Sequence, residues 1–392
     1  MMTIMGLRQA VGANGRRAGA RLAGAAAVLA VAAGLPACGA GGMSPAASQQ
    51  SAMARAAAAN PNLDTGTALG GVRAPDFRLT NQFGQPVSLS AFRGKVVILA
   101  FTDSECTTIC PLTTASMVEA KDLLGQAGDQ VQLLGIDANP QATSQSDVLA
   151  YSRSHAMVNQ WDFLTGTSAQ LSAAWRAYHV YVQIVHGQID HTPALYVIDT
   201  RGREAKLYLT TMAYTTVGQA AELLAREASG LLPGHPPLTR EQSLASVGGT
   251  SPATATTIPA AAGGAPVPLG PGQPRLVVFW ATWLDETTPL AASLTGLNAY
   301  AAAAAGGRLP RLVAVDEAVT EPSDGSAASY LRHLGTPLRY PVGLDTTGRL
   351  ADGYGVADQP WLVLVSAAGK IVWSHDGWLP VPALEAAART AG

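Results

Sequence analysis

The stretch "VVILAFTDSECTTICPLTTASM", residues 96–117, joins a strand pattern to a helix pattern through two cysteines. Residues 96–101 form an apolar run rich in β-branched side chains, which is typical of a buried central strand. Pro111 suits an early position in a helix, and apolar residues follow it at helical spacing. We therefore predict that Cys106 and Cys110 lie where a strand ends and a helix begins.

The segments around this stretch alternate between strand and helix patterns. A hairpin is expected within residues 74–95, and the chain should end this unit with a second hairpin and an amphipathic helix. Between them we expect a strand at 131–137 and helices at 146–155 and 168–178, with "WDFLTG" (161–166) before the second helix. This order predicts a thioredoxin-like α/β fold, in which a central mixed sheet is flanked by helices.

The same pattern returns after a segment rich in Pro, Gly, Ala and Thr. "RLVVFWATWL" (275–284) parallels "VVILAFTDSEC", and "QPWLVLVSAAGKIVW" (359–373) parallels "TPALYVIDTRGREAKLYL" (192–209). We predict two tandem thioredoxin-like domains. The expected division of the chain is a signal peptide at 1–38, a flexible tether at 39–71, a first domain at 72–231, a linker at 232–273 and a second domain at 274–392.

The N-terminal segment has the features of an export signal. Four arginines precede an apolar run at 22–37, which is shorter than the roughly 20 residues of a membrane-spanning helix. The run ends in "LPAC", which resembles a bacterial lipobox and implies lipidation of Cys38. We expect an extracytoplasmic protein, lipid-anchored to the bacterial cell membrane. The net charge of −2 gives no electrostatic support to nucleic-acid binding.

The cysteine pair leaves several chemistries open. A pair facing an oxidising compartment could form a structural disulfide, exchange disulfides with a client, or bind a metal. A thiol at a helix N-terminus has a lowered pKa, and the thiolate is both nucleophile and metal ligand. His191, in "IDHTPALYVID", is the candidate third ligand, because it precedes a strand expected beside that helix. Two thiolates and an imidazole suit Cu(I), with Zn(II) as competitor.

Residues 72–230 resemble the Sco (SenC-type) family of copper-binding, cytochrome oxidase assembly proteins. The resemblance rests on "PDFRLTNQFGQPVSLSAFRGKVVILAF", "CTTICP", "DANPQATSQSDVLAY", "WDFLTG" and "DHTPALYVIDTRG". It implies that copper, as Cu(I) or Cu(II), is held by Cys106, Cys110 and His191. It also implies a role in delivering copper to cytochrome c oxidase or in reducing the cysteines of the oxidase copper site. Asp103 and Glu105 depart from the family's usual approach to the first cysteine, and Pro193 is a more thioredoxin-like trait.

Residues 274–392 resemble the membrane-anchored thioredoxin-like proteins of the TlpA type. "VVFWATW", "YPVGLDTTGRLADGYGV" and "QPWLVLVSAAGKIVW" match in order, and Pro360 is expected to be cis. The reactive cysteines of that family are replaced by Leu284 to Thr287, and no cysteine follows Cys110. Dithiol chemistry is therefore excluded here. Two roles remain for this domain: it docks a partner, or it is a relic that is kept for stability. Trp283 and Trp361 could line a groove or simply pack in the core.

Our leading expectation is a copper metallochaperone for the cytochrome c oxidase copper centre. Its partner would be the copper-bearing subunit of the oxidase or another copper or thiol client. One alternative is an extracytoplasmic thiol–disulfide reductase that uses Cys106 and Cys110 as a redox-active pair. Another is a non-catalytic docking or scaffold protein that acts through the second domain. His186, five residues before His191, is a weaker candidate for an auxiliary ligand.

Overall fold

The computed structural model describes residues 54–55, 58, 60, 63–209, 215–241, 243–244, 257–286 and 289–391. The expected signal peptide at 1–38, with Cys38, lies outside these residues, as does most of the expected tether at 39–71. Among the helices that are described, none is both long enough and apolar enough to cross a membrane.

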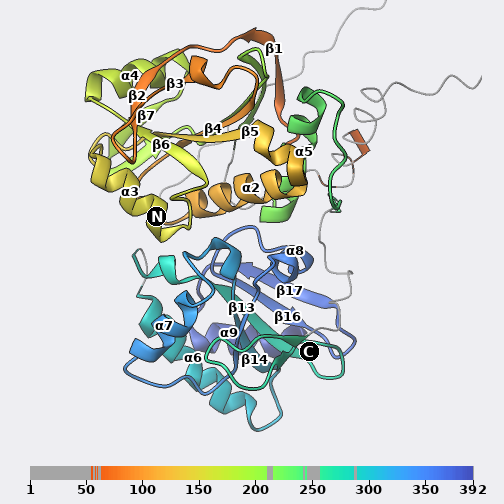
Figure 1. Cartoon of the computed structure of the whole chain (residues 1–392). Helices are drawn as coiled ribbons and strands as arrows, with labels where there is room; N and C mark the ends of the chain where they lie inside the picture. Colours follow the sequence, from red (N-terminus) through yellow and green to blue (C-terminus); the bar gives the residue numbers. More distant parts are fainter. Residues whose placement is uncertain are drawn as a thin grey trace, which may run out of the picture. The chain divides into compact units, whose positions relative to one another are not determined.

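The larger sheet has eight strands, and its four central strands follow the predicted pattern (Figure 1). β4 pairs in parallel with β5 and antiparallel with β9, which makes the sheet mixed. β2 and β3 form the predicted antiparallel hairpin. In spatial order the strands are β1 (Thr67–Arg73), β10 (Arg203–Leu209), β9 (Ala194–Ile198), β4 (Val96–Thr102), β5 (Val131–Asp137), β6 (Trp161–Thr165), β2 (Arg78–Asn81) and β3 (Pro86–Ser88).

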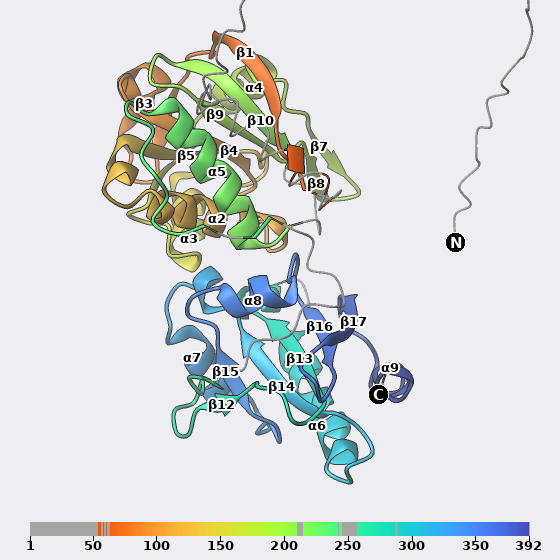
Figure 2. The same ribbon diagram turned by 90° about the vertical axis from the view of Figure 1, so that its right-hand side faces the viewer.

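Helices cover both faces of this sheet. Val96 and Ile98 of β4 belong to a core with α2 (Ile109–Leu123), α3 (Gln145–Ser154) and α5 (Val217–Leu231). Val97 and Leu99, which point to the opposite face, belong to a core with α4 (Ser168–Ala177). α2 and α5 lie side by side in both views (Figures 1 and 2). Two short 3₁₀ helices complete the unit, η1 (Leu89–Phe92) and η2 (Gly125–Gln130). The predicted mixed α/β architecture is confirmed for this part of the chain.

In two places this unit has strands where none was predicted. β1 begins at Thr67, inside the segment expected as tether, and pairs with β10. Gly70 and Gly71 interrupt its apolar pattern, with φ of 71° and 70°. The second is a hairpin of β7 (Val182–Val185) and β8 (Gln188–His191), which forms a two-stranded sheet of its own.

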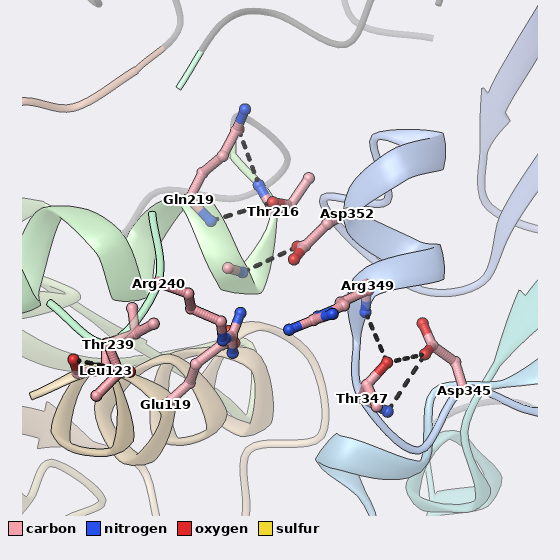
Figure 3. Close-up of polar contacts among 11 residues, drawn as sticks. Glu119, Leu123, Thr216, Gln219, Thr239, Arg240, Asp345, Thr347, Arg349 and Asp352 are labelled. Carbon is pink, nitrogen blue, oxygen red and sulfur yellow. Dashed lines mark hydrogen bonds and ion pairs between the residues drawn. The ribbon is translucent and has the colours of Figure 1, made fainter. Parts of the chain in front are cut away.

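The first residues of the expected linker lie against α2 (Figure 3). The backbone N–H and the hydroxyl of Thr239 both donate to the carbonyl oxygen of Leu123, at 2.7 and 3.1 Å. Arg240 forms an ion pair with Glu119 at 2.6 Å. Leu232 is buried. These contacts join residues 232–240 to the first folded unit.

A second, five-stranded sheet has the same central arrangement, because β13 pairs in parallel with β14 and antiparallel with β16. Its strands in spatial order are β15 (Val342–Leu344), β14 (Arg311–Asp316), β13 (Arg275–Trp280), β16 (Trp361–Val365) and β17 (Ile371–Asp376). Around it lie η3 (Thr282–Glu286), α6 (Leu290–Ala304), η4 (Ala318–Thr320), α7 (Ser326–His333), α8 (Arg349–Tyr354) and α9 (Val381–Ala391).

The core of this second sheet includes residues that were expected in the linker. β11 (Thr257–Ile258) and β12 (Val267–Pro268) pair with each other. Ile258 and Val267 are buried in one core with Val277 and Phe279 of β13. The folded part of the second unit therefore begins before residue 274.

Candidate metal centre

Cys106 and Cys110 lie at the predicted junction between β4 and α2. Cys106 is half-buried in the connecting loop, and its N–H donates to the carbonyl oxygen of Asp103 at 3.1 Å. Cys110 is the second residue of α2 and is only 4% exposed. Both are free thiols, and Thr108 supplies no side-chain cap to the helix N-terminus. The pair therefore lies at the N-terminus of the helix, where the helix dipole favours negative charge.

The two thiols share one hydrogen bond, and it separates their acidities. The hydrogen bond from Cys110, helped by Thr108, lowers the pKa of Cys106 to about 7 although burial opposes the shift. The hydrogen bond with Cys106 and burial raise the pKa of Cys110 well above its ordinary value. At neutral pH a large fraction of Cys106 is therefore thiolate, while Cys110 stays protonated. This state is suited to a soft metal ion or to nucleophilic attack.

His191 is the last residue of β8. Its Nδ1 atom lies 3.1 Å from the carbonyl oxygen of Thr192. A carbonyl oxygen can only accept, so Nδ1 carries the proton and the lone pair is on Nε2. Burial lowers the pKa of His191, which keeps the imidazole neutral. A neutral imidazole fixed in this tautomer is ready to ligate a metal through Nε2.

The structure brings the two sulfurs together but does not gather His191 with them. Within the part of the chain that is described, no group of three His, Cys, Asp or Glu side chains is close enough to hold a metal ion. His191 belongs to the separate β7–β8 hairpin, whereas Cys110 belongs to α2. His186 is exposed at the turn of that hairpin, with φ of 52°. A three-ligand site would require the hairpin to approach the N-terminus of α2.

Asn139 bridges two carboxylates beside the thiols, and this bridge, the Asn139 clamp, was not predicted. The side-chain amide of Asn139 donates to Asp103 Oδ1 at 2.8 Å and to Glu105 Oε2 at 3.1 Å. Asn139 is fully buried and also accepts from the N–H groups of Gln141 and Ala142. The two carboxylates stand out in the sequence because they precede Cys106. Their common donor follows β5, and the sequence alone does not assign it to this loop.

Asp137 is a further buried acid near the site. Its backbone lies opposite Thr102, the last residue of β4, in the parallel ladder. Oδ1 accepts from the N–H of Asn139 at 3.0 Å, while Oδ2 has no hydrogen-bond partner. Burial raises the pKa of Asp137 to about 8. The position of Asp137 at the carboxyl end of a central strand is the signal that could have identified it.

In the second sheet, the segment after β13 takes the place of the loop that carries Cys106, but its side chains are different. Trp283 and Leu284 are buried, and the Trp283 indole donates to the Thr320 hydroxyl at 3.1 Å. Trp283 is thus packed in the core, and Trp361 is half-buried. The Gln359–Pro360 bond is cis, as predicted, whereas Thr192–Pro193 is not. Among residues 257–286 and 289–391 there is no cysteine.

Fold and site together define the first unit as a mixed α/β domain with a reduced, acidic dithiol where a central strand meets a helix. Residues 67–226 match the family model SCO1/SenC. This match confirms the resemblance to the Sco family that was predicted for residues 72–230. The match ends before the second sheet begins.

Known relatives cover the same segment. The SCO1 protein homolog of Bacillus subtilis is 27% identical over 137 residues, which are 34% of this chain and 71% of that protein. Among solved structures, Bradyrhizobium japonicum ScoI with copper bound is 23% identical and covers 41% of this chain and 100% of its own, with a TM-score of 0.36. The apo Sco1 protein from Thermus thermophilus is 25% identical and covers 43% and 98%, with a TM-score of 0.37.

Proposed function

We propose that this protein binds one copper ion through Cys106, Cys110 and His191 and carries it to a client. The observation that carries the proposal is the protonation state of the proposed ligand atoms. One sulfur is a thiolate near neutral pH, because Cys110 donates a hydrogen bond to it. The imidazole of His191 is neutral, with its proton fixed on Nδ1 by the Thr192 carbonyl. Copper would supply a soft Lewis-acid centre that these donors match.

The match to the Sco family model supports a proposal for the client and the location. One protein of known structure, BsSco, is described as a member of the Sco family of cytochrome c oxidase assembly proteins, and two other solved Sco structures have copper bound. We infer that the client is the copper-bearing subunit of cytochrome c oxidase or another extracytoplasmic copper protein. A relative from Bacillus anthracis is described as a lipoprotein. This supports export and anchoring through a lipid on Cys38.

Anaerobic copper titration of the reduced protein tests the proposal. We expect one copper ion per chain in the wild type and loss of tight binding in Cys106→Ser and Cys110→Ser. Cys38→Ser is the matched control, because it removes the sulfur that would carry the lipid and leaves Cys106, Cys110 and His191 in place. Wild-type protein that binds no copper, or binds it equally well as Cys106→Ser, would contradict the proposal.

Thiol–disulfide reduction is a second candidate function, favoured by the pKa of about 7 at Cys106. An accessible thiolate next to a second thiol can attack a client disulfide and then release itself as a Cys106–Cys110 disulfide. This chemistry needs both sulfurs but not His191. A protein that reduces model disulfides at the same rate with and without His191, and binds no copper, would be a reductase.

We further propose that residues 67–240 and 257–391, each with its own sheet, are tandem thioredoxin-like domains, of which the second is a docking module. The shared strand arrangement around β4 and β13 supports this division. The second unit lacks thiols, so its contribution would be binding. A chain truncated before residue 257 should keep copper binding and lose client delivery. Unchanged delivery by this truncated chain would exclude the docking role.

A further inference from the structure

Asp316 is a carboxyl group inside an apolar core of the second unit. It is the last residue of β14, and Leu312 and Ala314, which point to the same face of that strand, belong to the core that packs on α6. Asp316 is fully buried, and no donor among the described residues reaches either of its carboxylate oxygens. An ionised carboxylate is too costly in such surroundings, so Asp316 carries a proton.

Glu321 is the acceptor for that proton. Glu321 directly follows η4 and is 3% exposed. The backbone N–H and the hydroxyl of Thr282 donate to its two carboxylate oxygens, Oε1 and Oε2 respectively. The side chains of Asp316 and Glu321 are also within hydrogen-bonding contact, and a bond between two carboxyl groups needs a proton on one of them. Because Thr282 donates twice to Glu321, Glu321 is the ionised member and Asp316 is the donor.

The groups that face this pair are acids. Burial raises the pKa of Asp316 well above its ordinary value, and the neighbouring acids Glu321, Glu317 and Asp324 add to the rise. Burial also raises the pKa of Glu321, although the hydrogen bonds that it accepts oppose the shift. In the described part of the chain, no lysine or arginine forms an ion pair with either member of the pair. The shared proton is therefore what keeps two carboxylates from facing each other.

The pair fastens the segment that follows β13. Thr282 is the first residue of η3, and its two bonds to Glu321 join η3 to the end of η4. The indole of Trp283, the next residue, donates to the hydroxyl of Thr320 in η4. This is the segment that takes the place of the loop that carries Cys106 in the first unit.

We propose that the proton shared by Asp316 and Glu321 is a pH-sensitive latch that holds η3 against η4. While Asp316 is protonated, the pair has a single negative charge, and Glu321 holds Thr282. When Asp316 loses its proton to solvent, two like charges face each other in an apolar core. The pair then separates, and Glu321 releases Thr282. This inference concerns the second unit and does not depend on copper binding.

Proton counting gives the direction of the pH effect. In the open form the Asp316 carboxyl is hydrated and has an ordinary pKa of about 4. In the closed form its pKa is raised, so the closed form binds one proton more than the open form between the two values. Each rise of one pH unit in that interval therefore favours opening by up to about tenfold.

Hydrogen exchange of the full chain tests the latch, measured by mass spectrometry on a peptide that contains Thr282. The N–H of Thr282 is itself one of the latch bonds, so its exchange reports opening. Asp316→Asn keeps a donor for Glu321 and cannot titrate. Comparing the wild type with this variant at the same pH cancels the intrinsic rate of exchange. We expect the ratio of the wild-type rate to the variant rate to rise at least about tenfold between about pH 5 and about pH 8.

Asp358→Asn is the matched control. Asp358 is another buried acid of this unit whose pKa is raised by burial, but the charge that acts on it is that of Asp376. Asparagine keeps the oxygen that accepts from the N–H of Gln359. This variant should have the pH dependence of the wild type.

Glu321→Gln tests the other half of the latch. Glutamine has one oxygen for the two donors of Thr282, so the peptide should exchange faster than in the wild type at every pH. Circular dichroism verifies that each variant is folded, and Glu321→Gln decides alone if Asp316→Asn does not fold.

Three results would overturn the latch. They are an equal pH dependence in the wild type and Asp316→Asn, a loss of pH dependence in Asp358→Asn, and wild-type exchange in Glu321→Gln. Copper binding by the first unit is measured separately, so none of these results touches the proposed function.

Discussion

The Nδ1 atom of His191 lies 3.1 Å from the carbonyl oxygen of Thr192, the next residue in the chain. Because the carbonyl accepts, the imidazole has its proton on Nδ1 and its lone pair on Nε2. The backbone thus leaves Nε2 as the atom for the ligand role that we propose, while the residue lies on a hairpin separate from the main sheet. This combination suits a ligand that closes onto a metal already held by two sulfurs.

Removing the imidazole should weaken copper binding and spare the thiols. We expect His191→Ala to lower copper affinity by about 100-fold. Mutation of a residue that only hydrogen-bonds to a metal ligand costs about 10- to 100-fold in affinity, and loss of a ligand should cost at least as much. The rate at which iodoacetamide alkylates Cys106 in the metal-free protein should stay the same. Competition titration and mass spectrometry measure the two quantities. His186→Ala is the control, since His186 is exposed at the hairpin turn. Equal copper affinity in His191→Ala would remove His191 from the site.

The acidity of Cys106 should depend on Cys110. In the reduced, metal-free protein the alkylation rate of Cys106 should rise with pH around a midpoint of about 7. The hydrogen bond from Cys110 is the main cause of this low pKa, so Cys110→Ala should move the midpoint upward, towards that of an ordinary thiol. The rate measured between about pH 5 and pH 10 gives both midpoints. An unchanged midpoint in Cys110→Ala would mean that the helix N-terminus alone lowers the pKa.

Stability should fall as pH rises, in part because of Asp137. Burial raises its pKa in the folded protein to about 8, above the value of about 4 for an unfolded chain. Between these values the folded state holds one proton more than the unfolded state, so the free energy of unfolding decreases with pH. Asp137→Asn cannot titrate and should lose less stability between about pH 5 and pH 8 than the wild type. Urea unfolding at the two pH values measures the difference, and equal losses in both proteins would contradict it.

The Asn139 clamp should matter for stability. Asn139→Ala removes hydrogen bonds to two carboxylates and leaves the N–H groups of Gln141 and Ala142 without their acceptor. We expect a loss of about 3 kcal/mol in the free energy of unfolding, the scale for buried bonds of this kind. Gln141→Ala is the control, because only its backbone takes part in the clamp. A loss below about 1 kcal/mol would mean that water replaces the amide.

Much of the first unit could be predicted because its sequence signals are strong. The apolar run of β4 and Pro111 after Cys110 are sufficient to place the dithiol between a strand and a helix. Strand β1 was missed because Gly70 and Gly71 interrupt its pattern, and its pairing with β10 depends on a segment about 130 residues later.

The site itself could be predicted only in part. Residue type and spacing single out Cys106, Cys110 and His191 as the proposed ligands, but they say nothing about proton positions. The carbonyl beside His191 belongs to the next residue and acts through local backbone geometry at the end of β8. The amide of Asn139 reaches Asp103 and Glu105 because β4 and β5 lie next to one another. Packing also decides the role of Trp283, whose burial in the core no pattern in the sequence could distinguish from a place in a groove.

The most direct test of the central claim is X-ray absorption spectroscopy of the copper-loaded full chain, with the wild type and His191→Ala measured side by side. Our account predicts two sulfur ligands and one imidazole nitrogen in the wild type, and loss of the imidazole signal in His191→Ala. Copper bound by sulfur alone in the wild type, or an imidazole signal that survives in His191→Ala, would contradict the three-ligand site.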